Sequence, residues 1–162
     1  MNDLKFAIKM EQDGEKYYRD QAEKNKNNAL HTVCLMLADD ENRHAQILMN
    51  KMNDMPFVLA PMDTLEKAKN IFEGMGDMKA PPQQENLSQF DFYRLAVDIE
   101  QKSIELYMEF KAKADNEKEK ELFDYLIKQE KQHFETLDEI SRMLRKSMET
   151  QDSAEFGLRP EY

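Results

Sequence analysis

The sequence contains few of the residues that build disulfides, tight turns and sheets. It has one cysteine, no tryptophan, four glycines and five prolines in 162 residues. The single thiol, Cys34, excludes an internal disulfide and any Cys-x-x-Cys metal or redox site. Little glycine and proline, together with 35% charged residues and many Glu, Lys, Leu and Met, is typical of helical proteins. We therefore expect one almost wholly α-helical domain.

Long hydrophobic runs and an excess of positive charge are also missing. No apolar segment approaches the roughly 20 residues that cross a bilayer, and the N-terminal MNDLKFAIKMEQD does not resemble a signal peptide. The formal net charge of −10 would repel a phosphate backbone. We expect a soluble, cytoplasmic protein whose partners include neither a membrane nor a nucleic acid.

Helical periodicity predicts four long helices arranged as two antiparallel pairs. A capping box at Ser88 and Asp91 indicates the start of the third helix, and Asp115 and Asn116 form the turn before the fourth. A long crossover rich in Pro and Gly, with one short helix inside it, joins the pairs, which is the topology of a ferritin-like four-helix bundle. The predicted segments are helices at 3–25 and about 30–53, a crossover at 54–87, a bundle spanning 1–148 and a polar tail at 149–162.

The two predicted pairs repeat one another at an offset of 89 residues. The coincident pairs are Ala7 and Ala96, Glu11 and Glu100, Gln12 and Gln101, Tyr18 and Tyr107, Leu37 and Leu126, Glu41 and Glu130, His44 and His133, and Leu48 and Leu137. In each half a lone Glu lies 30 residues before the Glu of a Glu-x-x-His motif, with the predicted turn halfway between them. At about 1.5 Å per residue, both ligands lie some 20 Å from the turn, so all four helices bring ligands to one level.

The residues at this level have the chemistry of a two-metal site. Glu and His three residues apart project from one helix face. Two Glu-x-x-His motifs and a Glu from each of two other helices form the ligand set of ferritin-like di-iron and di-manganese proteins. Two divalent cations would offset four buried carboxylates, and oxygen and nitrogen donors suit iron or manganese. We therefore predict two iron ions, with manganese as an alternative, bound by Glu11, Glu41, His44, Glu100, Glu130 and His133.

Two tyrosines follow the lone glutamates by two helical turns. Tyr18 and Tyr107 should lie on the same inward faces as Glu11 and Glu100. Each phenol is placed to hydrogen-bond a ligand carboxylate. A simple packing role explains the two tyrosines equally well.

The segments AIKMEQDGEKYY and AVDIEQKSIELY, with the motifs DENRH and EKQH, resemble the rubrerythrin-like branch of the ferritin-like superfamily over roughly residues 3–146. The resemblance implies that Glu41 and Glu130 bridge the two metals and act as the catalytic ligands. Glu11 with His44 would complete one iron, and Glu100 with His133 the other. Val97 occupies the position where rubrerythrins commonly have a seventh carboxylate. The six-ligand set is thus closer to that of bacterioferritin-type sites.

The resemblance also implies a di-iron oxidoreductase that reduces hydrogen peroxide or dioxygen. Rubrerythrins often have a rubredoxin domain with four cysteines, for which this sequence has no residues, so we expect an external rubredoxin-like or flavoprotein electron donor. Two alternatives remain open: a ferroxidase that handles iron as its substrate, and a non-catalytic helical module braced by metal. We expect a homodimer rather than a ferritin cage, because the residues after 148 show little helical signal.

Overall fold

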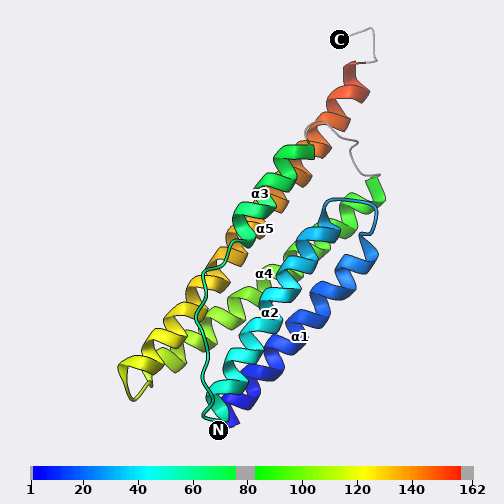
Figure 1. Ribbon diagram of the computed structural model, residues 1–162. Helices are drawn as coiled ribbons and strands as arrows, with labels where there is room; N and C mark the ends of the chain where they lie inside the picture. The colour runs from blue at the N-terminus through cyan, green and yellow to red at the C-terminus, as the bar shows by residue number, and fades with distance from the viewer. Residues whose placement is uncertain (1, 76–82, 158–162) are drawn as a thin grey trace.

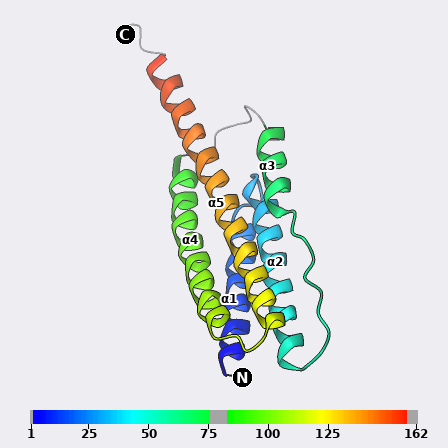
Figure 2. The same cartoon turned by 90° about the vertical axis from the view of Figure 1, so that its left-hand side faces the viewer.

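Five helices make up the computed structural model, which describes residues 2–75 and 83–157. They are α1 (Asn2–Lys24), α2 (Leu30–Met52), α3 (Thr64–Met75), α4 (Gln83–Ala112) and α5 (Glu117–Gly157). No strand occurs within the two described ranges. Helix α1 packs along α2 and α4 packs along α5, and the two pairs lie side by side (Figures 1 and 2). The predicted all-α, ferritin-like bundle is confirmed.

Short polar turns join the helices within each pair. At the start of α2, the Asn28 side-chain oxygen accepts the backbone N–H of Leu30 at 2.9 Å. At the start of α5, the Asn116 side-chain oxygen accepts the N–H of Glu119, also at 2.9 Å. These bonds satisfy N–H groups that have no partner in the first turn of a helix. Turns this short require the joined helices to run antiparallel.

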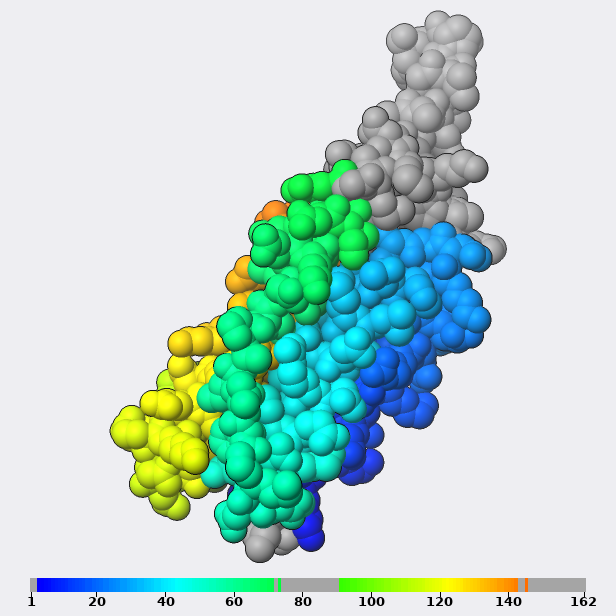
Figure 3. Space-filling model, viewed as in Figure 1, coloured from blue at the N-terminus to red at the C-terminus, as the bar shows by residue number. Residues whose placement is uncertain are grey.

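The crossover returns the chain along the outside of the bundle to α3. It lies over the face between α2 and α5 in the space-filling view (Figure 3), and α3 packs mainly against α5. The predicted crossover end at 87 is wrong, because α4 begins at Gln83 and includes Ser88, the expected cap. The sequence has no Pro or Gly between Gln83 and Ser88, so nothing prevents this earlier start. Residues 76–82 of the crossover lie outside the described ranges.

Helix α5 is longer than the sequence pattern predicts. The residues from 149 were expected to form a polar tail, but the helix continues to Gly157 and projects beyond the other helices (Figures 1 and 2). This stretch contains no proline, and it ends at a glycine, the residue most common just after a helix. Residues 158–162 of the predicted tail lie outside the described part of the chain, and the domain boundary at 148 stays a prediction.

The apolar core consists of two clusters at different heights in the bundle. One includes Tyr18, Leu37, Phe92 and Leu137, and the other includes Ala7, Leu48, Tyr107 and Leu126. In each long helix, the residues between these clusters include the predicted ligands. The ionisable layer is thus sealed by apolar packing above and below. No helix within the described ranges is long and apolar enough to span a membrane.

Candidate metal centre

Each of the four long helices contributes side chains to one buried ionisable layer. The layer contains Glu11 from α1, Glu41 and His44 from α2, Glu100 from α4, and Glu130 and His133 from α5. All six residues are at most 1% exposed. The structure therefore brings together all six side chains that the sequence singles out.

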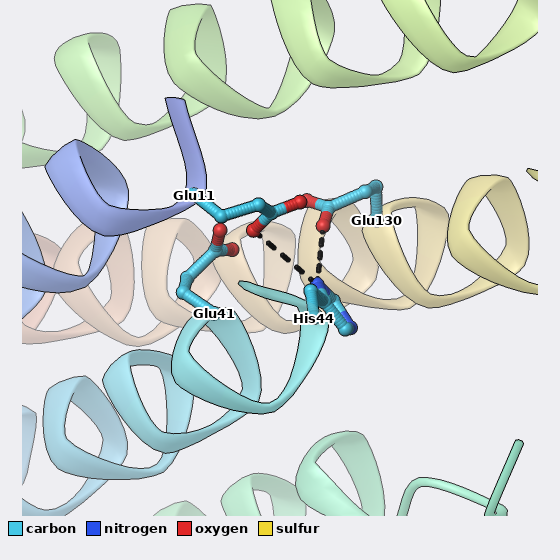
Figure 4. A group of neighbouring side chains, drawn as sticks. All are labelled: Glu11, Glu41, His44 and Glu130. Atoms are coloured by element: carbon cyan, nitrogen blue, oxygen red, sulfur yellow. Dashed lines mark ion pairs between the residues drawn. The ribbon is translucent and has the colours of Figure 1, made fainter. Parts of the chain in front are cut away.

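The six residues form two overlapping groups whose candidate ligand atoms lie within 4.8 Å of one another. The group that we name the Glu11–His44 position contains Glu11, Glu41, His44 and Glu130, and it is drawn in Figure 4. The Glu100–His133 position contains Glu41, Glu100, Glu130 and His133. Only Glu41 and Glu130 belong to both groups. Two cations bridged by a pair of carboxylates would require this sharing.

Both histidines turn the same ring nitrogen toward the carboxylates. The Nδ1 atom of His44 lies 2.8 Å from a Glu130 oxygen and 3.4 Å from a Glu11 oxygen, the contacts dashed in Figure 4. The Nδ1 atom of His133 lies 3.1 Å from an oxygen of Glu41 and 3.1 Å from an oxygen of Glu100. The Nδ1 atoms are therefore the candidate metal ligands, and the Nε2 atoms face away from the layer.

The groups behind the histidines determine where each ring proton sits. His44 Nε2 lies 2.5 Å from Oε1 of Gln129, whose amide nitrogen donates to the Ala60 carbonyl at 3.3 Å. Since the amide oxygen can only accept, His44 must donate through Nε2. His133 Nε2 lies 3.0 Å from a carboxylate oxygen of Asp40, which likewise only accepts when ionised. With the proton on Nε2, each Nδ1 atom is free to bind a cation.

The two tyrosines bond to glutamates of the opposite helix pair. Tyr18 in α1 donates to Glu100 in α4 at 2.6 Å, and Tyr107 in α4 donates to Glu11 in α1. Burial and the adjacent carboxylates raise the pKa of both phenols well above the ordinary value of 10. Both hydroxyls therefore stay protonated at neutral pH and keep donating to the carboxylates.

Several acceptor atoms in the layer face one another with no donor between them. Among the described residues, the buried side-chain atoms without a hydrogen-bond partner are Glu11 Oε2, Glu41 Oε1, His44 Nδ1, Glu100 Oε2 and both carboxylate oxygens of Glu130. Every one of them belongs to a predicted ligand. An unpaired buried carboxylate costs roughly several kcal/mol, so the layer requires protons or cations. Hard oxygen donors with two imidazoles fit iron or manganese.

Without a cation, the shared glutamates must carry protons. Burial, and then the charges of the neighbouring glutamates, raise the pKa of Glu41 and of Glu130 well above 4.5. Burial also opposes ionisation of Glu100, but His133 and hydrogen bonds outweigh it and lower its pKa to about 2. For His133, burial lowers the pKa, while the charge of Glu100 and the hydrogen bond to Asp40 raise it well above 6.5. Cation binding would therefore displace protons from this layer.

Asp40 and Gln129 contact the histidines but were not singled out from the sequence. Each immediately precedes the Glu of a Glu-x-x-His motif, and the two coincide at the same offset of 89 residues that relates the ligands. That coincidence is the signal that could have identified them. A further carboxylate near the ligands, Glu15, lies four residues after Glu11 in α1. It is outside the layer, because it pairs with Arg19 and Asn42.

Comparison with known proteins gives one match. The family model described as Rubrerythrin matches residues 2–154 of the chain. Searches of curated proteins and of solved structures return no significant match.

Proposed function

Because the chain belongs to the rubrerythrin family, we propose that it is a non-haem di-iron oxidoreductase that reduces hydrogen peroxide or dioxygen. The observation that supports this proposal is the buried layer of six side chains, five of which have atoms without a hydrogen-bond partner. The family match and the carboxylate and imidazole cluster fit a di-iron protein. Iron is proposed as the native metal, and manganese is the alternative that these ligands would also accept.

We propose that Glu41 and Glu130 would hold both ions, with Glu11 and His44 completing one site and Glu100 and His133 the other. When bound, two ferrous ions would supply the two electrons that reduce one hydrogen peroxide, with two protons, to two waters, and would themselves become ferric. Other residues of the protein orient the carboxylates and exclude water. Tyr18 and Tyr107 fix the carboxylates of Glu100 and Glu11 by hydrogen bonds. The two apolar clusters keep bulk water from the layer.

The reduced state must be restored by electrons from outside the layer. The 162 residues contain one cysteine, Cys34, which is fully buried, so they provide no Cys₄ iron centre. We propose a rubredoxin-like protein or a flavoprotein as the donor. We also propose a homodimer; Phe6 on α1 and Leu95 and Met108 on α4 are more than half exposed and are available to an interface.

Metal analysis combined with rapid kinetics tests the proposal. Protein purified without added metal should contain iron, up to two ions per chain. After anaerobic reduction, stopped-flow mixing with peroxide or with dioxygen should oxidise the bound iron faster than the same oxidant oxidises free ferrous iron. Glu130→Gln protein treated identically is the matched control, and it should lose this acceleration. Oxidation no faster than that of free ferrous iron would contradict a redox enzyme.

The same experiment separates the two alternatives. A ferroxidase would take up iron well beyond two ions per chain and release ferric product. The expected tail after 148 no longer argues against a cage, because this stretch is helical as far as Gly157. A metal-braced module would keep its metal through both mixing steps with no redox response.

A further inference from the structure

The two halves of the layer are alike in the bonds between tyrosines and unshared glutamates, and they differ in the groups behind the histidines. Each cation position has one unshared glutamate, which accepts a tyrosine hydroxyl, and one unshared histidine. The difference lies behind the histidines, where His133 faces the carboxylate of Asp40 and His44 faces the amide of Gln129. One position is therefore backed by a charged acceptor and the other by a neutral one.

Asp40 is held in place from three sides. One of its oxygens accepts from His133 at 3.0 Å and from the Thr64 hydroxyl at 2.5 Å. Its other oxygen accepts from Arg43 at 2.8 Å. The Asp40 side chain is 6% exposed, whereas that of Arg43 is 39% exposed. Water therefore screens much of the arginine charge, and Arg43 offsets the buried carboxylate only in part.

Gln129 is fixed by two hydrogen bonds and carries no charge. Its amide nitrogen donates to the carbonyl of Ala60, which also accepts the Tyr125 hydroxyl at 2.5 Å. The amide oxygen is therefore fixed toward His44. A hydrogen bond to an ionised acceptor is roughly twice as strong as one between neutral groups. A carboxylate behind an imidazole also makes the opposite ring nitrogen a stronger metal ligand.

From this contrast we infer that the two cation positions are unequal, and that Asp40 makes the Glu100–His133 position the tighter one. The inference rests on the proposed two-metal site. Asp40 acts through His133 as a positioning residue. Gly14, another difference between the halves, lies against Glu41, which both positions share, and so favours neither.

Stepwise titration of the metal-free protein tests the inference. Mn²⁺ is added to the anaerobic protein in a calorimeter, and Co²⁺ is added in parallel to record the visible spectrum at each step. We expect two binding steps whose dissociation constants differ by about 10- to 100-fold, the usual effect of an outer-shell partner. Asp40→Asn should weaken the first step by about this factor and change the Co²⁺ spectrum of the half-loaded protein.

Arg43→Ala provides the matched control for Asp40→Asn. Both changes remove the ion pair between residues 40 and 43, but only Asp40→Asn removes the carboxylate. The arginine variant should keep the ordered steps and the half-loaded spectrum of the wild type. Two equal steps in the wild type would overturn the inference, as would ordered steps that Asp40→Asn leaves unchanged.

Single-histidine variants test the order independently of Asp40→Asn and of how well that variant folds. His133→Ala should abolish or strongly weaken the first step, while His44→Ala should leave the first step and weaken the second. The opposite pattern would overturn the inference. Failure of the proposed two-metal site is distinguishable, because wild-type protein would then bind neither Mn²⁺ nor Co²⁺ in the layer. Failure of the redox activity alone would leave both binding steps in place and would appear only in the stopped-flow experiment.

Discussion

The first helix pair, α1 and α2, and the second pair, α4 and α5, agree in the ligands and tyrosines of the ionisable layer and differ at several positions of the apolar core. At the offset of 89 residues, the ligands and the tyrosines are identical. By contrast, Cys34 and Ala45 of the first pair correspond to Phe123 and Phe134 of the second. Apolar packing tolerates such exchanges of volume when neighbours compensate. A cluster of charged groups does not, because each buried group needs its own partner.

Every outer contact of the layer crosses from one pair to the other. Tyr18 of the first pair donates to a glutamate of the second, and Tyr107 does the reverse. Asp40 and Gln129 contact histidines across the same divide. Helix packing, in contrast, is most extensive within each pair. The layer therefore holds the two helix pairs together through hydrogen bonds, in addition to providing candidate ligands.

The largest expected effect comes from removing a ligand that both positions share. Glu130→Gln should lose both cations, with affinity reduced by more than about 100-fold, since even outer-shell changes cost about 10- to 100-fold. Glu100→Gln should keep the Glu11–His44 position and one cation. Metal per chain after dialysis, with helix content checked by circular dichroism, distinguishes them. Two cations retained by Glu130→Gln would break the distinction between shared and unshared ligands.

The next effect concerns how pH acts on the shared and unshared glutamates. The raised pKa values of Glu41, Glu130 and His133 stabilise the metal-free fold at low pH, and this contribution is lost as pH rises through them. The lowered pKa of Glu100 stabilises the fold at pH values above 4.5, the ordinary pKa of the group. This stabilisation is lost only as the pH falls toward about 2. Above about pH 5, the metal-free protein should therefore become less stable as pH rises through these raised pKa values.

Bound cations replace these protons, so the stabilisation by metal should grow with pH. The increase is about 1.4 kcal/mol per pH unit for each proton displaced. Thermal unfolding with and without Mn²⁺ across this pH range measures it. Metal-free Glu130→Gln, which has lost one titrating group, is the control, and its stability should depend less on pH than that of the metal-free wild type. A stabilisation by Mn²⁺ that shrinks as pH rises would contradict proton displacement.

A smaller effect is expected from the tyrosines, and it should be equal in the two pairs. Tyr18→Phe and Tyr107→Phe each remove a hydrogen bond to a buried carboxylate, which should lower the free energy of unfolding by about 1.5–3 kcal/mol. Tyr17→Phe is the control, because Tyr17 donates to the Phe92 carbonyl at 3.2 Å from a partly buried position. It should cost about 0.5–1.5 kcal/mol. Urea unfolding of the metal-free proteins measures the loss of unfolding free energy in all three variants. Clearly unequal losses for Tyr18→Phe and Tyr107→Phe would contradict the expected equivalence of the two helix pairs.

The smallest effect sharpens the comparison at Gly14, which corresponds to Ser103. A Cβ atom on residue 14 would lie 3.1 Å from a carboxylate oxygen of Glu41. Gly14→Ala gains about 1 kcal/mol of helix propensity but displaces a shared ligand, so both Mn²⁺ steps should weaken together. We expect the Mn²⁺ affinity of each step to fall by less than the roughly 10-fold that follows from losing a residue behind a ligand. Ser103→Ala is the control and should leave both Mn²⁺ binding steps unchanged in the same calorimetric titration. If Gly14→Ala weakened only one of the two steps, Glu41 would not be shared by both positions.

The sequence predicts the helical bundle because apolar periodicity is a local signal that survives into the fold. The internal repeat identifies six side chains that the structure places in one layer; their role as metal ligands stays a prediction. The start of α4 was placed too late, because a good cap at Ser88 does not stop a helix that has already begun. Asp40 and Gln129 were missed because their positions depend on contacts with the crossover, which has no periodic pattern.

The crossover does more than return the chain to the second helix pair. Thr64 and the carbonyl of Ala60 lie in one short segment on the outside of the bundle, yet one anchors the group behind His133 and the other anchors the group behind His44. Sliding this segment along the molecule would disturb both imidazoles at once without touching either of them. A protein that binds this segment, or a protease that cleaves it, would therefore alter the surroundings of both histidines from the surface of the molecule.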